Sequence, residues 1–143
     1  MREYKVIDTF LFNGEFEMLK MRLDYFYDSV DYFVICESDY TQSGVKKELS
    51  YPGNEYLFEE YKDKLIYIVY RPEQEDIDKV KENSFQLEKK HIDFIRDSIL
   101  HLSDSNTATM LSGVDEFPDK NRFDEMWERI KDIGFDSISY SMK

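Results

Sequence analysis

The adjacent acids Asp115 and Glu116 are the residues whose type and position best suit chemistry. They lie in the segment 111–118 (LSGVDEFP), where a short β-prone run precedes the acids and Phe-Pro turns the chain toward a helix. Carboxylate oxygens at a strand end are the ligands that Mg²⁺ or Mn²⁺ requires when it bridges a protein to a substrate diphosphate. The alternative is an acidic turn without a ligand, which is common in a chain with 31 carboxylates.

The elements that must position these acids alternate along the chain. Apolar runs predict strands at 6–12, 32–36, 65–70 and 107–111, with a last β-prone segment at 137–142. Helical spacing predicts helices at 16–28, 55–61, 77–102 and 119–133, and allows a break near Asn83-Ser84. Asn13 and Asp119 are expected as N-caps. This order is typical of an α/β, Rossmann-like fold, a mostly parallel sheet with flanking helices, formed by residues 1–143 as one domain.

Ligands of such sheets bind outside the carboxyl ends of the strands, which directs attention to 13–14, 37–47 and 112–118. The glycine-rich dinucleotide and P-loop motifs and the His-Glu-x-x-His zinc motif are absent. His91 and His101 are too far apart on one helix to share a metal. We interpret His91 as a helix-face histidine and Cys36, the only cysteine, as a small buried apolar residue.

Charge restricts the partners. The chain has 31 acidic and 19 basic side chains, a net charge of −12 and a pI near 4.6. These values argue against duplex nucleic acid and anionic membrane surfaces as partners. An acidic protein still binds a phosphorylated ligand where a cation or a local basic pocket neutralises it. There is no signal-peptide pattern and no apolar run long enough for a membrane span, so we expect a cytoplasmic protein.

Five segments, in order, resemble glycosyltransferase family 17, which includes the β-1,4-mannosyl-glycoprotein β-1,4-N-acetylglucosaminyltransferases. The first is 8–15 (DTFLFNGE), continuing to Leu19 and Arg22-Leu23, and the second is 30–38 (VDYFVICES), similar to the family's VDYFVIVES. The others are Thr41, Gly44 and Lys46, then Arg96-Asp97 with Ile99, and finally 112–118 (SGVDEFP), similar to SDVDEIP. The resemblance spans nearly the whole chain.

The resemblance implies an A-type glycosyltransferase that transfers a sugar, N-acetylglucosamine in the named members, from a UDP-linked donor to a glycan or another hydroxyl acceptor. A cation, Mn²⁺ or Mg²⁺, on Asp115 and Glu116 would neutralise the diphosphate. The expected donor-binding residues are Asp8, Phe10 and Asn13 for the nucleoside, Glu37 and Ser38 beside them, and Lys46 and Arg96 for phosphate. No residue is assigned as the catalytic base.

The chain departs from the family pattern in two ways. Gly113 replaces the first acid of the family's Asp-x-Asp motif, and family members continue past the length of this chain, so the resemblance implies a truncated fold without the acceptor half. The rival interpretation is a non-catalytic nucleotide-sugar-binding or interaction module. Structural alternatives also exist for single residues: Phe10 in the core, Lys46 in solvent, and Arg96 paired on its own helix.

Overall fold

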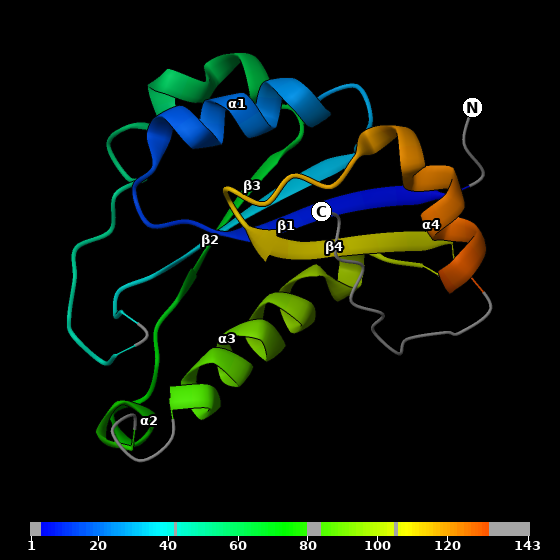
Figure 1. Cartoon of the computed structure of the whole chain (residues 1–143). Helices are drawn as coiled ribbons and strands as arrows, with labels where there is room; N and C mark the ends of the chain where they lie inside the picture. The colour runs from blue at the N-terminus through cyan, green and yellow to red at the C-terminus, as the bar shows by residue number, and fades with distance from the viewer. Residues whose placement is uncertain (1–3, 42, 80–83, 105, 132–143) are drawn as a thin grey trace.

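A parallel sheet is the centre of the computed structural model, which describes residues 4–41, 43–79, 84–104 and 106–131 (Figure 1). Its strands are β1 (Lys5–Leu11), β2 (Tyr32–Ser38), β3 (Leu65–Tyr70) and β4 (Thr107–Gly113), in the order β3-β2-β1-β4. The register places Leu11 beside both Cys36 and Gly113. Because all pairings are parallel, the carboxyl ends of the strands meet at one edge, on the left of Figure 1.

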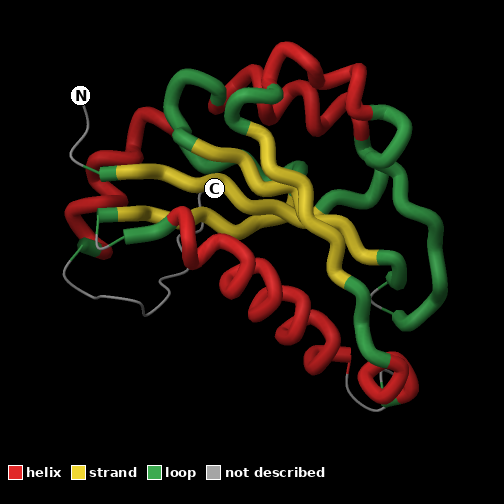
Figure 2. Tube along the Cα trace, turned by 180° about the vertical axis from the view of Figure 1, so that it is seen from behind, coloured by secondary structure: helices red, strands yellow, loops and turns green. Residues whose placement is uncertain are grey.

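Helices cover both faces of the sheet, as Figure 2 shows from behind. Val6 and Phe10 of β1 point into the larger core with α1 (Phe16–Phe26), whereas Ile7, on the opposite face, packs with α3 (Ser84–Ile99). Strand β2 is covered on both sides, which explains its continuous apolar sequence. The predicted Rossmann-like α/β fold is therefore confirmed.

The start of the first helix corrects one prediction. Glu15, and not Asn13, occupies the N-cap position of α1, and the Asn13 N–H donates to Glu15 Oε1 at 2.7 Å. Gly14 lies between them at φ +91°, in a left-handed conformation that favours glycine. This turn leaves Asn13 three residues before the first helical residue, too early to cap the helix.

The predicted long helix 77–102 is divided in the structure. It comprises α2 (Gln74–Asp78), α3, and the 3₁₀ turn η2 (Leu100–Leu102), and residues 80–83 lie outside the described residues. Ile95 packs near Cys36 and Tyr70, whereas Ile99 packs near Ile7 and Val34. Helix α3 therefore runs from the carboxyl edge of the sheet toward its amino edge.

The remaining helical segments agree with the predicted positions. Segment η1 (Glu55–Tyr61) is a 3₁₀ helix, and Asp119 caps the 3₁₀ turn η3 (Lys120–Arg122), which leads into α4 (Phe123–Ile130). The predicted end of the last helix and the β-prone segment 137–142 lie outside the described residues. Among the helices described, none has the length and apolar character needed to cross a membrane.

Candidate functional site

The acidic turn after β4 presents two exposed carboxylates at the carboxyl edge of the sheet. Glu116 closes the turn, because its N–H donates to Gly113 O at 3.1 Å and its Oε1 accepts from the Gly113 N–H at 2.8 Å. A Cβ atom added to Gly113 would lie 3.0 Å from Asp115 Oδ1 and 3.0 Å from Glu116 Oε1. The two carboxylates therefore converge on the space that a side chain at position 113 would enter.

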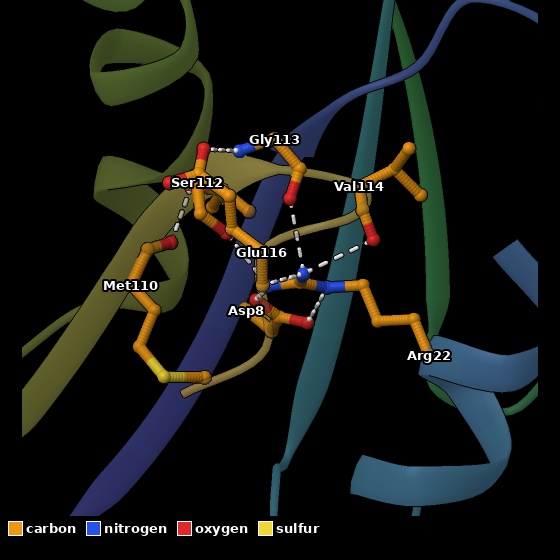
Figure 3. A network of polar contacts seen from close by, with 8 residues as sticks. Asp8, Arg22, Met110, Ser112, Gly113, Val114 and Glu116 are labelled. Carbon is orange, nitrogen blue, oxygen red and sulfur yellow. Dashed lines mark hydrogen bonds and ion pairs between the residues drawn. The ribbon is translucent and has the colours of Figure 1, made fainter. Parts of the chain in front are cut away.

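Arg22 of α1 fixes this turn from the protein interior (Figure 3). Its Nη1 donates to the backbone carbonyls of Gly113 at 3.1 Å, Val114 at 3.4 Å and Glu116. Its Nη2 donates to Ser112 Oγ at 2.8 Å. A guanidinium presents several donors in one fixed plane, so a single buried side chain determines the path of the turn that carries the acids.

Asp8 completes the Arg22 network. The Arg22 Nε donates to Asp8 Oδ2 at 2.8 Å and Nη2 donates to Oδ1 at 2.6 Å, and both side chains are fully buried. Burial raises the pKa of Asp8 above its ordinary value, although the hydrogen bonds and charge of Arg22 oppose this effect. Phe10 is also fully buried, with its ring centroid 4.8 Å from the guanidinium carbon. Both oxygens of Asp8 and the ring of Phe10 are thus engaged inside the protein.

The spacing of apolar residues in α1 could have indicated that Arg22 is buried, which the motif comparison did not. Leu19, Leu23 and Phe26 form the buried stripe of α1, and Arg22 falls on that stripe at helical spacing. A charged residue on an apolar helix face needs a buried partner, because an unpaired buried charge is very costly. Asp8, the acid inside the first strand, is that partner.

Glu37, at the end of β2, fixes the long loop that follows that strand. Its carboxylate is fully buried and accepts from the backbone N–H of Ser50 at 2.5 Å and of Tyr51 at 3.1 Å, and from the Tyr67 hydroxyl at 2.8 Å. Burial raises the pKa of Tyr67, and the hydrogen bond to Glu37 and the negative charge of Glu37 raise it further. The neighbouring Ser38 is also buried, with Oγ accepting from the Tyr40 N–H at 3.1 Å.

Asp39, immediately after β2, forms ion pairs with two basic side chains at the carboxyl edge. Its Oδ2 lies 2.9 Å from Lys46 Nζ and 3.0 Å from Arg71 Nη1, and Arg71 directly follows β3. Burial favours a higher pKa for Asp39, but the hydrogen bonds and charges of Lys46 and Arg71 prevail and lower it. The predicted residue Lys46 is therefore at the edge, in a cluster whose other members, Asp39 and Arg71, the motifs did not single out.

The remaining predicted donor-binding residues lie in different places. Asn13 is exposed at the end of β1, the strand between β2 and β4, and so lies at the same edge as the acidic turn. Arg96 is exposed in the last turn of α3, which reaches toward the amino edge. The structure therefore brings Asn13 to the edge where Asp115 and Glu116 lie, whereas the phosphate-binding role of Arg96 stays a prediction.

A cysteine and a histidine meet on the other face of the sheet. Cys36 Sγ lies 3.1 Å from His91 Nε2, and the His91 ring stacks on Tyr70 at a centroid distance of 4.8 Å. Burial raises the pKa of the Cys36 thiol to about 12 and lowers the pKa of His91 to about 4, with smaller effects of Glu37 and Lys47 respectively. Both groups are thus neutral near pH 7, so they form a buried structural pair and not an activated nucleophile.

The acidic turn fits a divalent cation that shares its coordination with a ligand. Within the described residues, no group of three or more His, Cys, Asp or Glu side chains could hold a metal ion. Asp115 and Glu116 would therefore supply two carboxylates, and the remaining positions would be filled by water and substrate phosphates, a common arrangement for Mg²⁺. Hard oxygen donors that converge on open space suit Mg²⁺ or Mn²⁺ better than a softer metal.

Comparison with known proteins gives one match. The family model described as Glycosyltransferase family 17 matches residues 1–134. Searches of the curated proteins and of the solved structures found no match.

Proposed function

The chain belongs to glycosyltransferase family 17, and on that basis we propose that it transfers a sugar from a UDP-linked donor to a glycan or another hydroxyl acceptor. N-acetylglucosamine is the donor sugar that the named family members suggest. We further propose that a divalent cation, Mn²⁺ or Mg²⁺, binds at Asp115 and Glu116 and contacts the donor diphosphate.

The observation that supports the cation most directly is the convergence of the two carboxylates over Gly113. Gly113 stands where the family has its first acid. Oxygens of Asp115 and Glu116 border the space that a side chain at position 113 would enter. Arg22 holds three carbonyls of the turn, so the carboxylates are presented by a fixed backbone. Preorganised charge is more effective than charge that must reorganise when the substrate binds.

When bound, the cation would neutralise the negative charge that develops on the diphosphate leaving group. The chain's own residues then have distinct parts. Asp115 and Glu116 would hold the cation, and the exposed Asn13, two residues after the end of β1, would contact the ribose. Asp8, Phe10 and Glu37 act as framework, because their contacts lie inside the protein.

A second function is favoured by the same Gly113 that leaves space for the two carboxylates. With one acid fewer than the family motif, the chain would bind a nucleotide sugar without transferring it, as a binding or interaction module. The two functions make the same prediction for binding and differ for turnover. Release of free sugar from the donor distinguishes them, because only a working transferase cleaves the donor bond.

The test is a thermal-shift titration with UDP, CDP and GDP, each with and without Mn²⁺. A ligand at 100 times its dissociation constant stabilises the folded state by about 2.7 kcal/mol, which is readily measured. We expect UDP with Mn²⁺ to raise the melting temperature, and we expect Asp115→Ala to abolish the contribution of Mn²⁺. The absence of a shift with every nucleotide would refute the proposed function.

Asp63→Ala is the matched control. Asp63 is an exposed carboxylate in the turn before β3, at the amino edge of the sheet, so its removal should leave the Mn²⁺ response unchanged. If Asp115→Ala responds to Mn²⁺ as the wild type does, the cation is bound elsewhere and the assignment to the acidic turn is wrong.

A further inference from the structure

The carboxylate of Glu37 connects the end of the long loop after β2 to β2 and β3. Its Oε1 accepts from the Tyr51 N–H at 3.1 Å and from the hydroxyl of Tyr67, on β3, at 2.8 Å. Its Oε2 accepts from the Ser50 N–H at 2.5 Å and lies 3.7 Å from Lys47 Nζ. The side chain is fully buried and both oxygens are used inside the protein, so any effect of Glu37 on a ligand must pass through the residues that it holds.

Ser50 transmits this constraint to the turn after β1. Both of its backbone groups are bonded, because its N–H donates to Glu37 and its carbonyl accepts from Asn54 Nδ2 at 2.7 Å. A Cβ atom added to Gly14 would lie 3.0 Å from Ser50 Oγ and 3.5 Å from Ser50 Cβ. The turn at Gly14 therefore packs directly against Ser50, and a displacement of Ser50 would remove the surface that supports this turn.

Tyr51 forms a second connection, on the other side of Asn13. Its ring packs edge-on against Phe12 at a centroid distance of 6.4 Å, and both residues are buried. Phe12 immediately precedes Asn13, which is exposed beyond the end of β1. Glu37 accepts from the Tyr51 N–H, so it holds the chain before Asn13 through Tyr51 and the chain after Asn13 through Ser50.

We infer that Glu37 is a positioning residue for the donor, because it fixes the exposed amide of Asn13 where that amide can bond the hydroxyls of the ribose. This inference rests on the proposed function. An amide group both donates and accepts, and so do the two hydroxyls of a ribose, so the two groups are chemically matched. Such a hydrogen bond depends on distance and angle, and a displacement of about 1 Å at Asn13 is enough to lose it.

Glu37→Gln tests this role because it removes an acceptor without changing the shape of the side chain. Glutamine has only one acceptor oxygen, so its amino group would face the N–H of either Ser50 or Tyr51. The substitution therefore releases one of the two connections to Asn13. Glu48→Gln is the matched control, since Glu48 is an exposed carboxylate of the same loop and the chemical change is identical.

The experiment measures dissociation constants for UDP, 2′-deoxy-UDP and 3′-deoxy-UDP by calorimetry, each with and without Mn²⁺. We expect the wild type and Glu48→Gln to bind UDP about tenfold more tightly than at least one deoxy analogue, which is the effect of one hydrogen bond. Glu37→Gln and Asn13→Ala should each reduce this preference below about twofold, and the double variant should reduce it no further, because both changes act on one contact. The gain in UDP affinity caused by Mn²⁺ should be the same in Glu37→Gln as in the wild type.

Several results would overturn the inference and leave the proposed function standing. One is equal binding of all three nucleotides by the wild type. Another is an undiminished preference for UDP in Glu37→Gln, even where every affinity falls, because Glu37 would then act only on the stability of the fold. A third is a reduced Mn²⁺ effect in Glu37→Gln, and a fourth is a pair of effects that add in the double variant.

Ser50→Gly replaces Glu37→Gln if the latter does not fold. It keeps the hydrogen bonds of Glu37 but removes the side chain that lies beside Gly14, so the preference for UDP should fall. An unchanged preference in Ser50→Gly would overturn the inference as well. If no nucleotide binds to the wild type, both proposals are wrong.

Discussion

Acidification should destabilise this protein through His91 of α3, which is buried against Cys36 and Tyr70. The pKa of His91 in the folded protein is about 4, well below the ordinary value of 6.5, chiefly because burial disfavours the charged ring. Nearby Lys47 adds a smaller repulsion. When the pH falls below 6.5 the unfolded chain takes up the proton first, so the folded state loses stability.

The size of the loss follows from the two pKa values. At pH 5 the histidine is almost fully protonated in the unfolded chain but about nine-tenths neutral in the folded protein. Linkage then gives a destabilisation of about 2 kcal/mol relative to pH 7.5, rising to about 3 kcal/mol below pH 4. Because the Cys36 thiol has a pKa of about 12, it does not titrate in this range.

Urea unfolding at pH 7.5 and pH 5 measures this loss, with the fluorescence of Trp127, the single tryptophan, as the signal. Asp39 and Asp104 also have lowered pKa values and contribute to acid destabilisation, so the informative comparison is with His91→Gln. The glutamine amide can still contact Cys36 but does not titrate. The variant should lose about 2 kcal/mol less than the wild type between the two pH values, and an equal loss in both would refute the reasoning.

Three further predictions concern the candidate site. Arg22→Met should destabilise the fold by about 3–5 kcal/mol in urea unfolding, because it leaves Asp8 buried and unpaired, whereas a loss below 1 kcal/mol would contradict the network. Glu37→Gln should cost about 2 kcal/mol and increase proteolytic cleavage in the loop after β2, and unchanged cleavage would argue against its anchoring role. Gly113→Asp should lower the stability of the metal-free protein, because the new carboxylate would repel Asp115 and Glu116. The same variant should be stabilised more by Mn²⁺ than the wild type is, and calorimetric unfolding with and without Mn²⁺ measures both effects.

The sequence predicted the sheet well for a physical reason. Strands β2 and β3 are short, mostly apolar runs, and β2 lacks alternation because helices cover both its faces, so composition marks these segments. The helix at 55–61 and the strand at 65–70 were predicted with their observed bounds. One error lies at a helix start, where Gly14 separates Asn13 from α1. The break that the sequence allowed near Asn83-Ser84 agrees with the start of α3 at Ser84.

The polar networks depend on contacts between distant segments, which local patterns do not encode. Arg22 reaches the turn at Gly113 from α1, and Arg71, which follows β3, reaches Asp39, which follows β2; the order of the strands in the sheet brings these residues together. The acidic turn could be found because both its acids are adjacent in the sequence. Whether Asp8 and Glu37 face a ligand or the core could not be predicted from the sequence, because burial and hydrogen bonding decide it, and both side chains are fully buried.

The most direct test of the central claim is an electron paramagnetic resonance titration of Mn²⁺ with the wild type and with Asp115→Asn/Glu116→Gln, in the presence of UDP. Free Mn²⁺ gives a strong signal that is lost on binding, so the experiment reports cation binding without requiring turnover. We predict that the wild type binds one Mn²⁺ when UDP is present and that the double variant binds at least tenfold more weakly. Equal binding by both proteins would contradict the assignment of the cation to this turn.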